Sequence, residues 1–296
     1  DNLASECHIG YKSGENLIIL DPLEEIIVGF SDSLIFNNIA ENNTNGFVID
    51  GENIIIENNT ARYNENNGFD IFSSLILEEI LPIDPWWNFI PIISFFNNTA
   101  IFNGENGASI SSHRCLVSGN TFTHNRIGIA VFRDIINITN NLIEYNSEYG
   151  ICVFDYPSLI NDNIIRFNSY GMYVGSYPPF DETTLIEIIS GTTQIYDNTV
   201  SFNIQGLSLF HAMSVMIYHN NFLNNSNQAY DNGWGSWDIG YPSGGNYWSD
   251  WTSPDTMAGP DQDIPGSDGF VDNPRAIDGG SNFDMYPFTT PNGWLI

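Results

Sequence analysis

An asparagine that recurs at a nearly constant interval is the feature that most constrains this chain. It occupies eight positions: Asn38, Asn59, Asn98, Asn120, Asn141, Asn163, Asn198 and Asn221. Five of the seven steps between these positions are 21–23 residues long. The two longer steps, 39 and 35 residues, fit one repeat plus an insertion. Such a period indicates stacked repeats, each of which contacts mainly its neighbours.

Other residue types keep the same period when that asparagine is the origin. Five residues later a second asparagine follows in seven of the eight repeats: Asn43, Asn64, Asn103, Asn125, Asn146, Asn168 and Asn203. The positions two after and three before the origin are always apolar. Four after it, five repeats have an aromatic residue: Tyr63, Phe102, Tyr145, Phe167 and Phe202. A glycine then precedes a third apolar stretch: Gly46, Gly68, Gly107, Gly128, Gly150, Gly171 and Gly206.

These columns predict an all-β solenoid, a parallel β-helix of about eight to nine coils. Alternating apolar residues indicate short strands with one face inward. Glycine and asparagine suit turns because they tolerate the left-handed backbone conformation. We expect an N-terminal coil or cap at 1–30, repeats over 31–230 with insertions at about 73–93 and 175–191, and a Trp- and Asp-rich irregular cap at 231–296.

The repeat resembles the NosD-like right-handed parallel β-helix family, within the group of carbohydrate-binding proteins and sugar hydrolases. The tail is similar to that family's usual ending, in a Gly-Gly-Asn-Tyr-Trp-Ser-Asp-Trp segment at 244–251, an acidic loop at 261–272 and Asp-Met-Tyr-Pro-Phe at 284–288. The resemblance implies a right-handed coil. It leaves function open, because this fold hosts lyases, hydrolases, epimerases, adhesins and scaffolds.

The charge balance limits the partners of the chain. Seven Lys+Arg stand against 36 Asp+Glu, a net charge of −29, which disfavours nucleic acid, anionic membranes and free polyanionic sugars. No apolar run is long enough to insert directly into a membrane. We expect an extracellular, cell-surface or periplasmic protein. Of its three cysteines, Cys115 and Cys152 lie at different offsets, so we expect no disulfide between them.

Asp261, Asp263, Asp268 and Asp272 in the acidic loop are candidate Ca²⁺ ligands. Alternating carboxylates with glycine at the bends can surround a hard cation with oxygen atoms. The alternative is a solvated acidic turn.

A second candidate site lies between the two insertions, which leave the coil at nearly the same offset. The ligand-binding candidates there are His113, Arg114, Arg133, Asp134, Asp155 and Tyr156. Scarce cations meet carboxylates in this column, and aromatic insertions would wall a groove. The alternative is a solvated column of turn residues.

Three weaker features complete the candidates. The cap aromatics Trp234, Trp237, Tyr241, Tyr247, Trp248 and Trp251 either cover the last coil or stack on sugar rings. His211, Met213, Met216 and His219 suggest copper ligands, against the alternative of ordinary strand and turn residues. Glycosylation sequons occur at Asn42, Asn58, Asn97, Asn137 and Asn224.

These features favour a non-enzymatic extracellular or cell-surface β-helix that is structural, glycan-binding or both, stabilised by Ca²⁺. Its partner would be a glycan or a neighbouring surface protein. The motifs of polygalacturonases and the Asp-Pro-His of alginate epimerases do not occur in the sequence. One alternative is a polysaccharide lyase or glycoside hydrolase acting in the groove, where Asp134 and Asp155 share an offset. Another is a self-assembling filament or sheath subunit.

Overall fold

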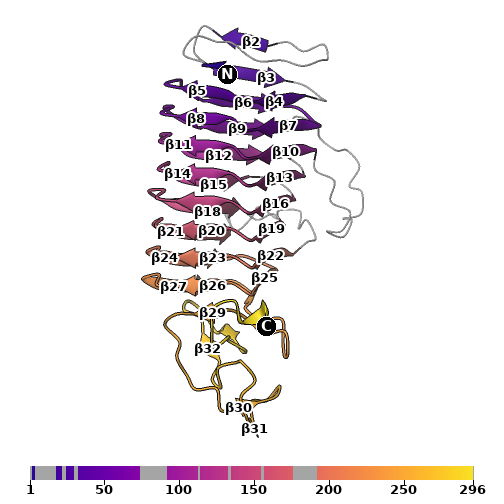
Figure 1. Ribbon diagram of the computed structural model, residues 1–296, viewed down its shortest axis with the longest axis vertical. Helices are drawn as coiled ribbons and strands as arrows, with labels where there is room; N and C mark the ends of the chain where they lie inside the picture. Colours follow the sequence, from indigo (N-terminus) through magenta and orange to yellow (C-terminus); the bar gives the residue numbers. More distant parts are fainter. Residues whose placement is uncertain are drawn as a thin grey trace, which may run out of the picture.

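The chain winds into a right-handed parallel β-helix of about eight turns, closed at its C-terminal end by an irregular cap (Figure 1). The computed structural model describes strands at 2–3, 18–21 and 25–29, and residues 33–73, 92–112, 114–132, 135–154, 157–175 and 192–295. The predicted fold is therefore confirmed. Nearly all of both insertions, 74–91 and 176–191, lies outside the described residues.

Each complete coil contributes one strand to each of three sheets, in the order sheet I, sheet II, sheet III. Sheet I contains β4 (Leu34–Phe36), β7 (Ile54–Glu57), β10 (Ile93–Phe96), β13 (Cys115–Ser118), β16 (Ile136–Thr139), β19 (Ser158–Asn161), β22 (Thr193–Tyr196), β25 (Val215–Tyr218) and β28 (Gly235–Ser236). Sheet II contains β1 (Asn2–Leu3), β5 (Asn38–Glu41), β8 (Thr60–Arg62), β11 (Thr99–Ile101), β14 (Thr121–Thr123), β17 (Leu142–Glu144), β20 (Ile164–Arg166), β23 (Thr199–Ser201), β26 (Asn221–Leu223) and β29 (Tyr247–Trp248). Sheet III contains β2 (Ile18–Asp21), β3 (Glu25–Gly29), β6 (Phe47–Asp50), β9 (Phe69–Phe72), β12 (Asn106–Ser111), β15 (Ile127–Val131), β18 (Tyr149–Phe154), β21 (Tyr170–Gly175), β24 (Gln205–Phe210) and β27 (Asn227–Asp231).

Strand pairing changes at the two ends of the solenoid. Neighbouring coils pair in parallel, whereas β2 and β3 pair antiparallel at the N-terminal end. The cap contains two short antiparallel hairpins, β30 (Met257–Ala258) with β31 (Ile264–Pro265) and β32 (Arg275–Ala276) with β33 (Phe283–Asp284), and the 3₁₀ helix η2 (Gly293–Leu295). β28 and β29 fall inside the segment predicted as the cap, yet they still extend sheets I and II.

Alternate residues of the strands point inward and form one continuous hydrophobic core. The ring centres of Phe47 and Phe69 stack 4.8 Å apart, and the core extends to Trp237, Trp248 and Ile277 in the cap. Cys115 belongs to this core, whereas Cys152 is buried outside it. Both thiols are free, as predicted, and burial raises the pKa of Cys115 to about 12.

Two columns of buried asparagines link the coils. The first asparagine ladder, between sheets I and II, consists of Asn38, Asn59, Asn98, Asn120, Asn141, Asn163, Asn198, Asn220 and Asn246. The second asparagine ladder, between sheets II and III, consists of Asn43, Asn64, Asn103, Asn125, Asn146, Asn168, Asn203 and Asn225. In the first ladder, Oδ1 of Asn141 accepts from both N and Nδ2 of Asn120, at 2.9 and 3.0 Å. Each amide thus satisfies backbone groups that the turn would otherwise leave unpaired.

The predicted column is wrong at its last member. Asn220, not Asn221, continues the ladder, because Asn198 N donates to Asn220 Oδ1 at 3.1 Å. Asn221 begins β26 and its Nδ2 donates to Asn292 Oδ1 instead. With this register, the second asparagine occurs five residues after the origin in all eight coils, since Asn225 completes the set.

The recurring glycines at or just before the start of the sheet III strands are needed for close packing between coils, not for a left-handed backbone conformation. These glycines do not have positive φ angles; a Cβ at Gly150 would lie 2.5 Å from the carbonyl oxygen of Gly171 in the next coil. The left-handed conformation instead falls on the residue just before each ladder asparagine except Asn246. Before the second ladder this residue is often aromatic, as at Tyr145 (φ 56°).

We expect Asn141→Ala to lower the free energy of unfolding by about 3 kcal/mol, because it leaves the backbone N–H of Asn120 without its partner and removes the hydrogen bonds to the carbonyls of Val117 and Thr139. Urea denaturation followed by circular dichroism measures this. The control is Asn140→Gly, at the adjacent exposed, left-handed position, where glycine fits and the change should be within about 0.5 kcal/mol. Equal effects of the two substitutions would contradict a structural role for the ladder.

Candidate functional site

The cap is built around two buried aspartates, each of which holds a buried tryptophan. Asp231 accepts from the backbone N–H of Gly233 and from Trp237 Nε1, at 2.8 and 2.9 Å. Asp284 accepts from Trp248 Nε1 at 2.8 Å and from the backbone N–H groups of Asn246 and Tyr286. Two members of the predicted aromatic cluster therefore cover the last coil, each about 1% exposed. Trp234, by contrast, is 74% exposed.

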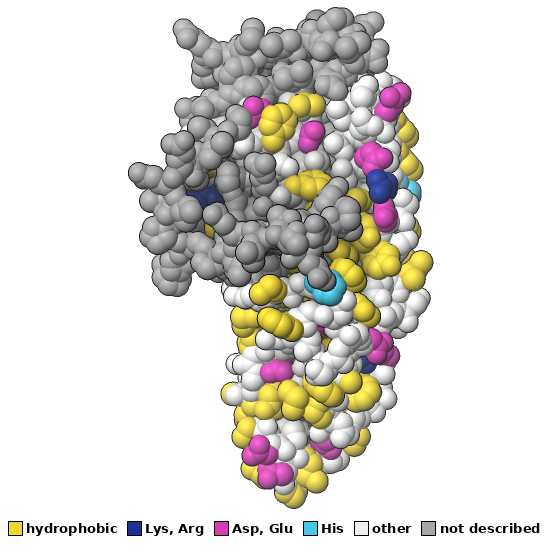
Figure 2. Space-filling model, turned by 180° about the vertical axis from the view of Figure 1, so that it is seen from behind, with side chains coloured by type: hydrophobic (Ala, Val, Ile, Leu, Met, Phe, Trp, Pro, Cys, Tyr) yellow, Lys and Arg dark blue, Asp and Glu magenta, His cyan; other side chains and the backbone are white. Residues whose placement is uncertain are grey.

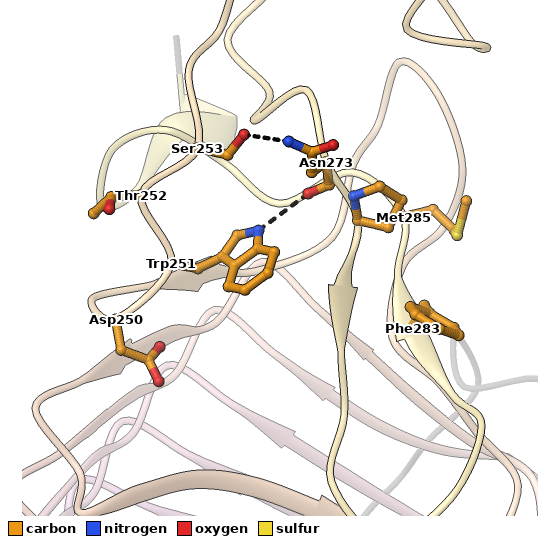
Figure 3. A pocket seen from close by; sticks show the side chains of 8 residues that line it. Asp250, Trp251, Thr252, Ser253, Asn273, Phe283 and Met285 are labelled. Atoms are coloured by element: carbon orange, nitrogen blue, oxygen red, sulfur yellow. Dashed lines mark hydrogen bonds between the residues drawn. The ribbon is translucent and has the colours of Figure 1, made fainter.

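An open pocket of about 770 Å³ lies beside this buried centre (Figure 3). It is lined by Asp250, Trp251, Thr252, Ser253, Asn273, Pro274, Phe283 and Met285. Phe283 and Met285 are nearly half exposed, so the lining offers apolar surface to a ligand. Trp251 donates its indole N–H to the carbonyl of Asn273 at 3.0 Å, and Asn273 Nδ2 donates to Ser253 Oγ at 2.7 Å. These two bonds fix one wall of the pocket.

The charge at the pocket edge is balanced. Arg275 forms a bidentate ion pair with Asp250, in which Nη1 lies 2.8 Å from Oδ1 and Nη2 lies 3.0 Å from Oδ2. Its guanidinium also lies 4.5 Å from the ring centre of Trp248 and 5.8 Å from that of Trp251. Arg275 is the one Lys or Arg in residues 231–296. The pocket edge is therefore locally neutral within an acidic cap.

Five of the six predicted groove residues, His113, Arg133, Asp134, Asp155 and Tyr156, lie outside the described residues. Arg114 is half-buried in the turn before β13, and its carbonyl accepts from the backbone N–H of Ile92 at 2.9 Å. The groove hypothesis and its enzymatic alternative therefore stay predictions.

The acidic loop uses much of its carboxylate capacity internally. Asp272 accepts from the hydroxyl of Thr256 at 2.7 Å and from the backbone N–H groups of Met257 and Thr256 at 2.9 and 2.8 Å, and these hydrogen bonds lower the pKa of Asp272. Asp268 Oδ2 accepts from the backbone N–H of Gly259, while Asp261 and Asp263 are exposed. No three His, Cys, Asp or Glu side chains in the described part of the chain form a group that could hold a metal ion.

Four of the five sequons lie on the outside of turns. Asn42, Asn58, Asn97 and Asn224 are exposed and have positive φ angles, whereas Asn137 is half-buried on β16. In these four the ladder asparagine is the next residue, so a modified side chain would not disturb the ladder.

The sequence did not indicate Asn273, Phe283 or Met285 as pocket residues. The cap lacks a repeat, and only the two hairpins and Asp284 bring these positions beside Trp251. A partial signal was available in Arg275, a single cation within a segment that contains ten Asp.

The parallel sheets and ladders define the class of this chain as a right-handed parallel β-helix protein. Two solved structures with this fold are similar: the A-modules of the Azotobacter vinelandii mannuronan C-5 epimerases AlgE6 (TM-score 0.57, 20% identity, 70% of this chain and 56% of that one) and AlgE4 (0.55, 21%, 69% and 56%). The chain thus spans just over half of each. No curated protein matches it. Residues 93–253, more than half of the chain, match the model described as periplasmic copper-binding protein (NosD), and the chain belongs to the NosD family.

The family description raises the question of copper. His219 Nε2 lies 2.8 Å from the carbonyl of Ser243 and its ring stacks on Trp294 at 5.2 Å, so this imidazole is held within the fold. Met213 is 58% exposed and His211 is also exposed. These described side chains therefore do not fit a copper site.

We expect the cap to lose stability as the pH rises from about 4 to about 7. Burial raises the pKa of Asp284 to about 7, against the hydrogen bonds from Trp248 and Asn246, which lower it. The protonated form is therefore favoured in the folded chain, and its stabilising effect is lost as the pH rises through the folded pKa. The full effect is roughly 4 kcal/mol at most.

Asp284→Asn should remove this pH dependence, while Asp278→Asn, at an exposed cap position, should retain it. Urea unfolding of the three proteins between pH 4 and 8 measures the difference. A parallel pH profile in Asp284→Asn and the parent would show that Asp284 is ionised throughout.

Calcium binding at Asp261, Asp263, Asp268 and Asp272 also stays a prediction. A bound ion should raise the melting temperature, since it binds only the folded chain. Calorimetry in Ca²⁺ and in EDTA checks this, with the quadruple Asp→Asn variant as the control. An identical melting temperature in both buffers would show that the loop is a solvated turn.

Proposed function

We propose that this protein is a glycan-binding β-helix that acts outside the cytoplasm, with the cap pocket as its binding site. The observation that carries the proposal is Trp251, in the wall of an open pocket. Trp251 is only partly buried against the core, so the rest of its ring remains for apolar contact with a ligand. Pockets that combine apolar rings with a few polar groups are typical small-ligand sites. Thr252, which is exposed, and Ser253 supply hydroxyl groups at the rim.

The ligand we propose is a neutral sugar. Asp250 is neutralised by Arg275, so the described lining of the pocket offers no free cation for a uronate carboxylate. The remaining charge of the cap is strongly negative and would repel a polyuronate. The apolar faces of a pyranose and its hydroxyl groups match a lining of aromatic, hydroxyl and amide side chains.

Binding rather than hydrolysis is the proposed role. Glycosidases ordinarily use two carboxyl groups that flank the scissile bond. The described lining of the pocket contains a single carboxylate, Asp250, which is held by Arg275. The fold shared with epimerase modules does not transfer their activity. The family's description as periplasmic supports a location outside the cytoplasm. No helix in the described part of the chain has the length and apolar character needed to span a bilayer.

Trp251→Ala should weaken binding of neutral oligosaccharides at least about tenfold, because it removes the ring that forms the wall. A glycan array would identify the ligand, and isothermal titration calorimetry would give the dissociation constant. The control is Trp234→Ala, which removes an exposed cap tryptophan outside the pocket and should leave affinity unchanged. Trp251→Phe should retain part of the affinity.

Two results would contradict the proposal. Equal affinities of Trp251→Ala and the parent would place the glycan elsewhere. Tight binding of a polyuronate without divalent cations would contradict the electrostatic argument. Circular dichroism of each variant shows whether the cap has kept its fold.

A further inference from the structure

Six ring side chains form a stacked column on the outside of the solenoid, here called the aromatic ladder: Tyr63, Phe102, His124, Tyr145, Phe167 and Phe202. Successive ring centres are 4.6–5.3 Å apart across five coil-to-coil steps. The column follows sheet II, at the corner that precedes the second asparagine ladder. It is separate from the cap pocket.

The turn itself does not require aromatic residues at this corner. Every member of the ladder has a positive φ angle, a conformation that bulky side chains rarely adopt. Asn42 and Asn224 occupy the same position in the first and last coils, with φ angles of 59° and 53°. Asparagine therefore suits the backbone, and the rings contribute a surface that the turn does not need.

The ladder is the largest concentration of exposed apolar side chains on the described coils. Six of the twelve large hydrophobic residues exposed between 33 and 230 lie at this corner: Tyr63, Phe102, Tyr145, Phe167, Phe202 and Ile204. Ring faces inside the column are covered by the neighbouring rings, so ring edges are what solvent meets. A sugar ring could not stack on those faces. An extended row of ring edges instead matches another flat apolar surface.

The charges beside the ladder are unusually balanced. Three of the seven Lys+Arg are here, and all are paired with glutamates of adjacent coils: Arg62 with Glu41, Arg126 with Glu105 and Glu148, and Arg166 with Glu144. Together with exposed Glu65, two residues after Tyr63, these side chains have a net charge of −2, whereas residues 231–296 hold ten Asp and one Arg. Figure 2 shows the contrast for the wider described surface, where acidic side chains recur and basic ones are few.

We propose that the aromatic ladder is the contact surface for a second copy of this chain, in an antiparallel, side-by-side dimer. Two copies with a net charge of −29 each repel strongly, so they can approach best where the charge is locally neutralised. A two-fold axis across the column places each ladder on the other, and it keeps the two acidic caps at opposite ends. In that arrangement Tyr63 faces Phe202, and His124 faces Tyr145.

Sedimentation equilibrium over a range of concentrations tests the association. The parent chain should be a dimer that dissociates on dilution. Phe102→Asn with Phe202→Asn should weaken dimerisation at least tenfold; asparagine fits this backbone, and neither change creates a sequon. The control Ile55→Asn, at an exposed residue of sheet I, should leave the dimer unchanged. A parent that is monomeric at every concentration, or a double variant that associates like the parent, would overturn the proposal.

A charge variant tests the same surface without changing the rings. Arg126→Gln leaves Glu105 and Glu148 without their shared cation, so it should weaken the dimer, and added sodium chloride should partly restore it. No effect of this variant would overturn the electrostatic part of the proposal. Trp251→Ala should dimerise normally, which separates this proposal from the glycan pocket.

Cross-linking tests the orientation. In a Cys7→Ser background, Tyr63→Cys mixed with Phe202→Cys should give a disulfide-linked dimer on non-reducing gels, whereas each variant alone should not. Cross-linking of Tyr63→Cys with itself would mean that the copies are parallel, and it would overturn the antiparallel arrangement.

Discussion

The hydrogen bond from one ladder asparagine to the next is the interaction on which the rest of this structure depends. Each coil turns from sheet I to sheet II within one or two residues, which leaves backbone groups that no sheet can pair. Asparagine suits this place because its amide both accepts and donates: Asn98 Nδ2 donates to the carbonyl of Ile56 and to Asn120 Oδ1. The same bond also fixes the register of neighbouring coils, since the donor and acceptor must lie at the same offset. The columns in the sequence are therefore a direct consequence of this bond.

A ladder needs a final acceptor, and the cap supplies it. Asn246 accepts from Asn220, but no further coil follows, and its own backbone N–H donates to Asp284 Oδ2 at 2.8 Å. The carboxyl group of Asp284 lies so close to Gly245 that a Cβ there would be 1.9 Å from Oδ1. The Gly-Asn segment at 245–246 and the Asp-Met-Tyr-Pro segment at 284–287 thus contact each other and together end the solenoid. The cap pocket is an exposed extension of this arrangement, because Trp251 and Phe283, which line it, flank the same centre.

The period allowed the fold to be predicted in detail, but it could not fix a register between two adjacent asparagines. Asn220 and Asn221 both have apolar residues three before and two after them, so polarity alone does not distinguish them. The pairing with Asn198 does. The cap lacks such a period, so its pocket could not be predicted. Asn273 and Met285 reach Trp251 only through contacts between segments distant in sequence.

The corner before the second asparagine ladder shows how such a solenoid can change its surface without changing its core. The left-handed residue points away from the core, and its neighbour, the ladder asparagine, holds the coil whatever that residue is. Asn42, Tyr63 and His124 occupy the same corner with the same backbone conformation. A side chain at this position is therefore free of the packing constraints that act on Ile143 or Phe122 nearby. Because identical offsets stack at the coil spacing, one residue type repeated here becomes a continuous stripe, so a surface property spreads along the whole rod through few substitutions.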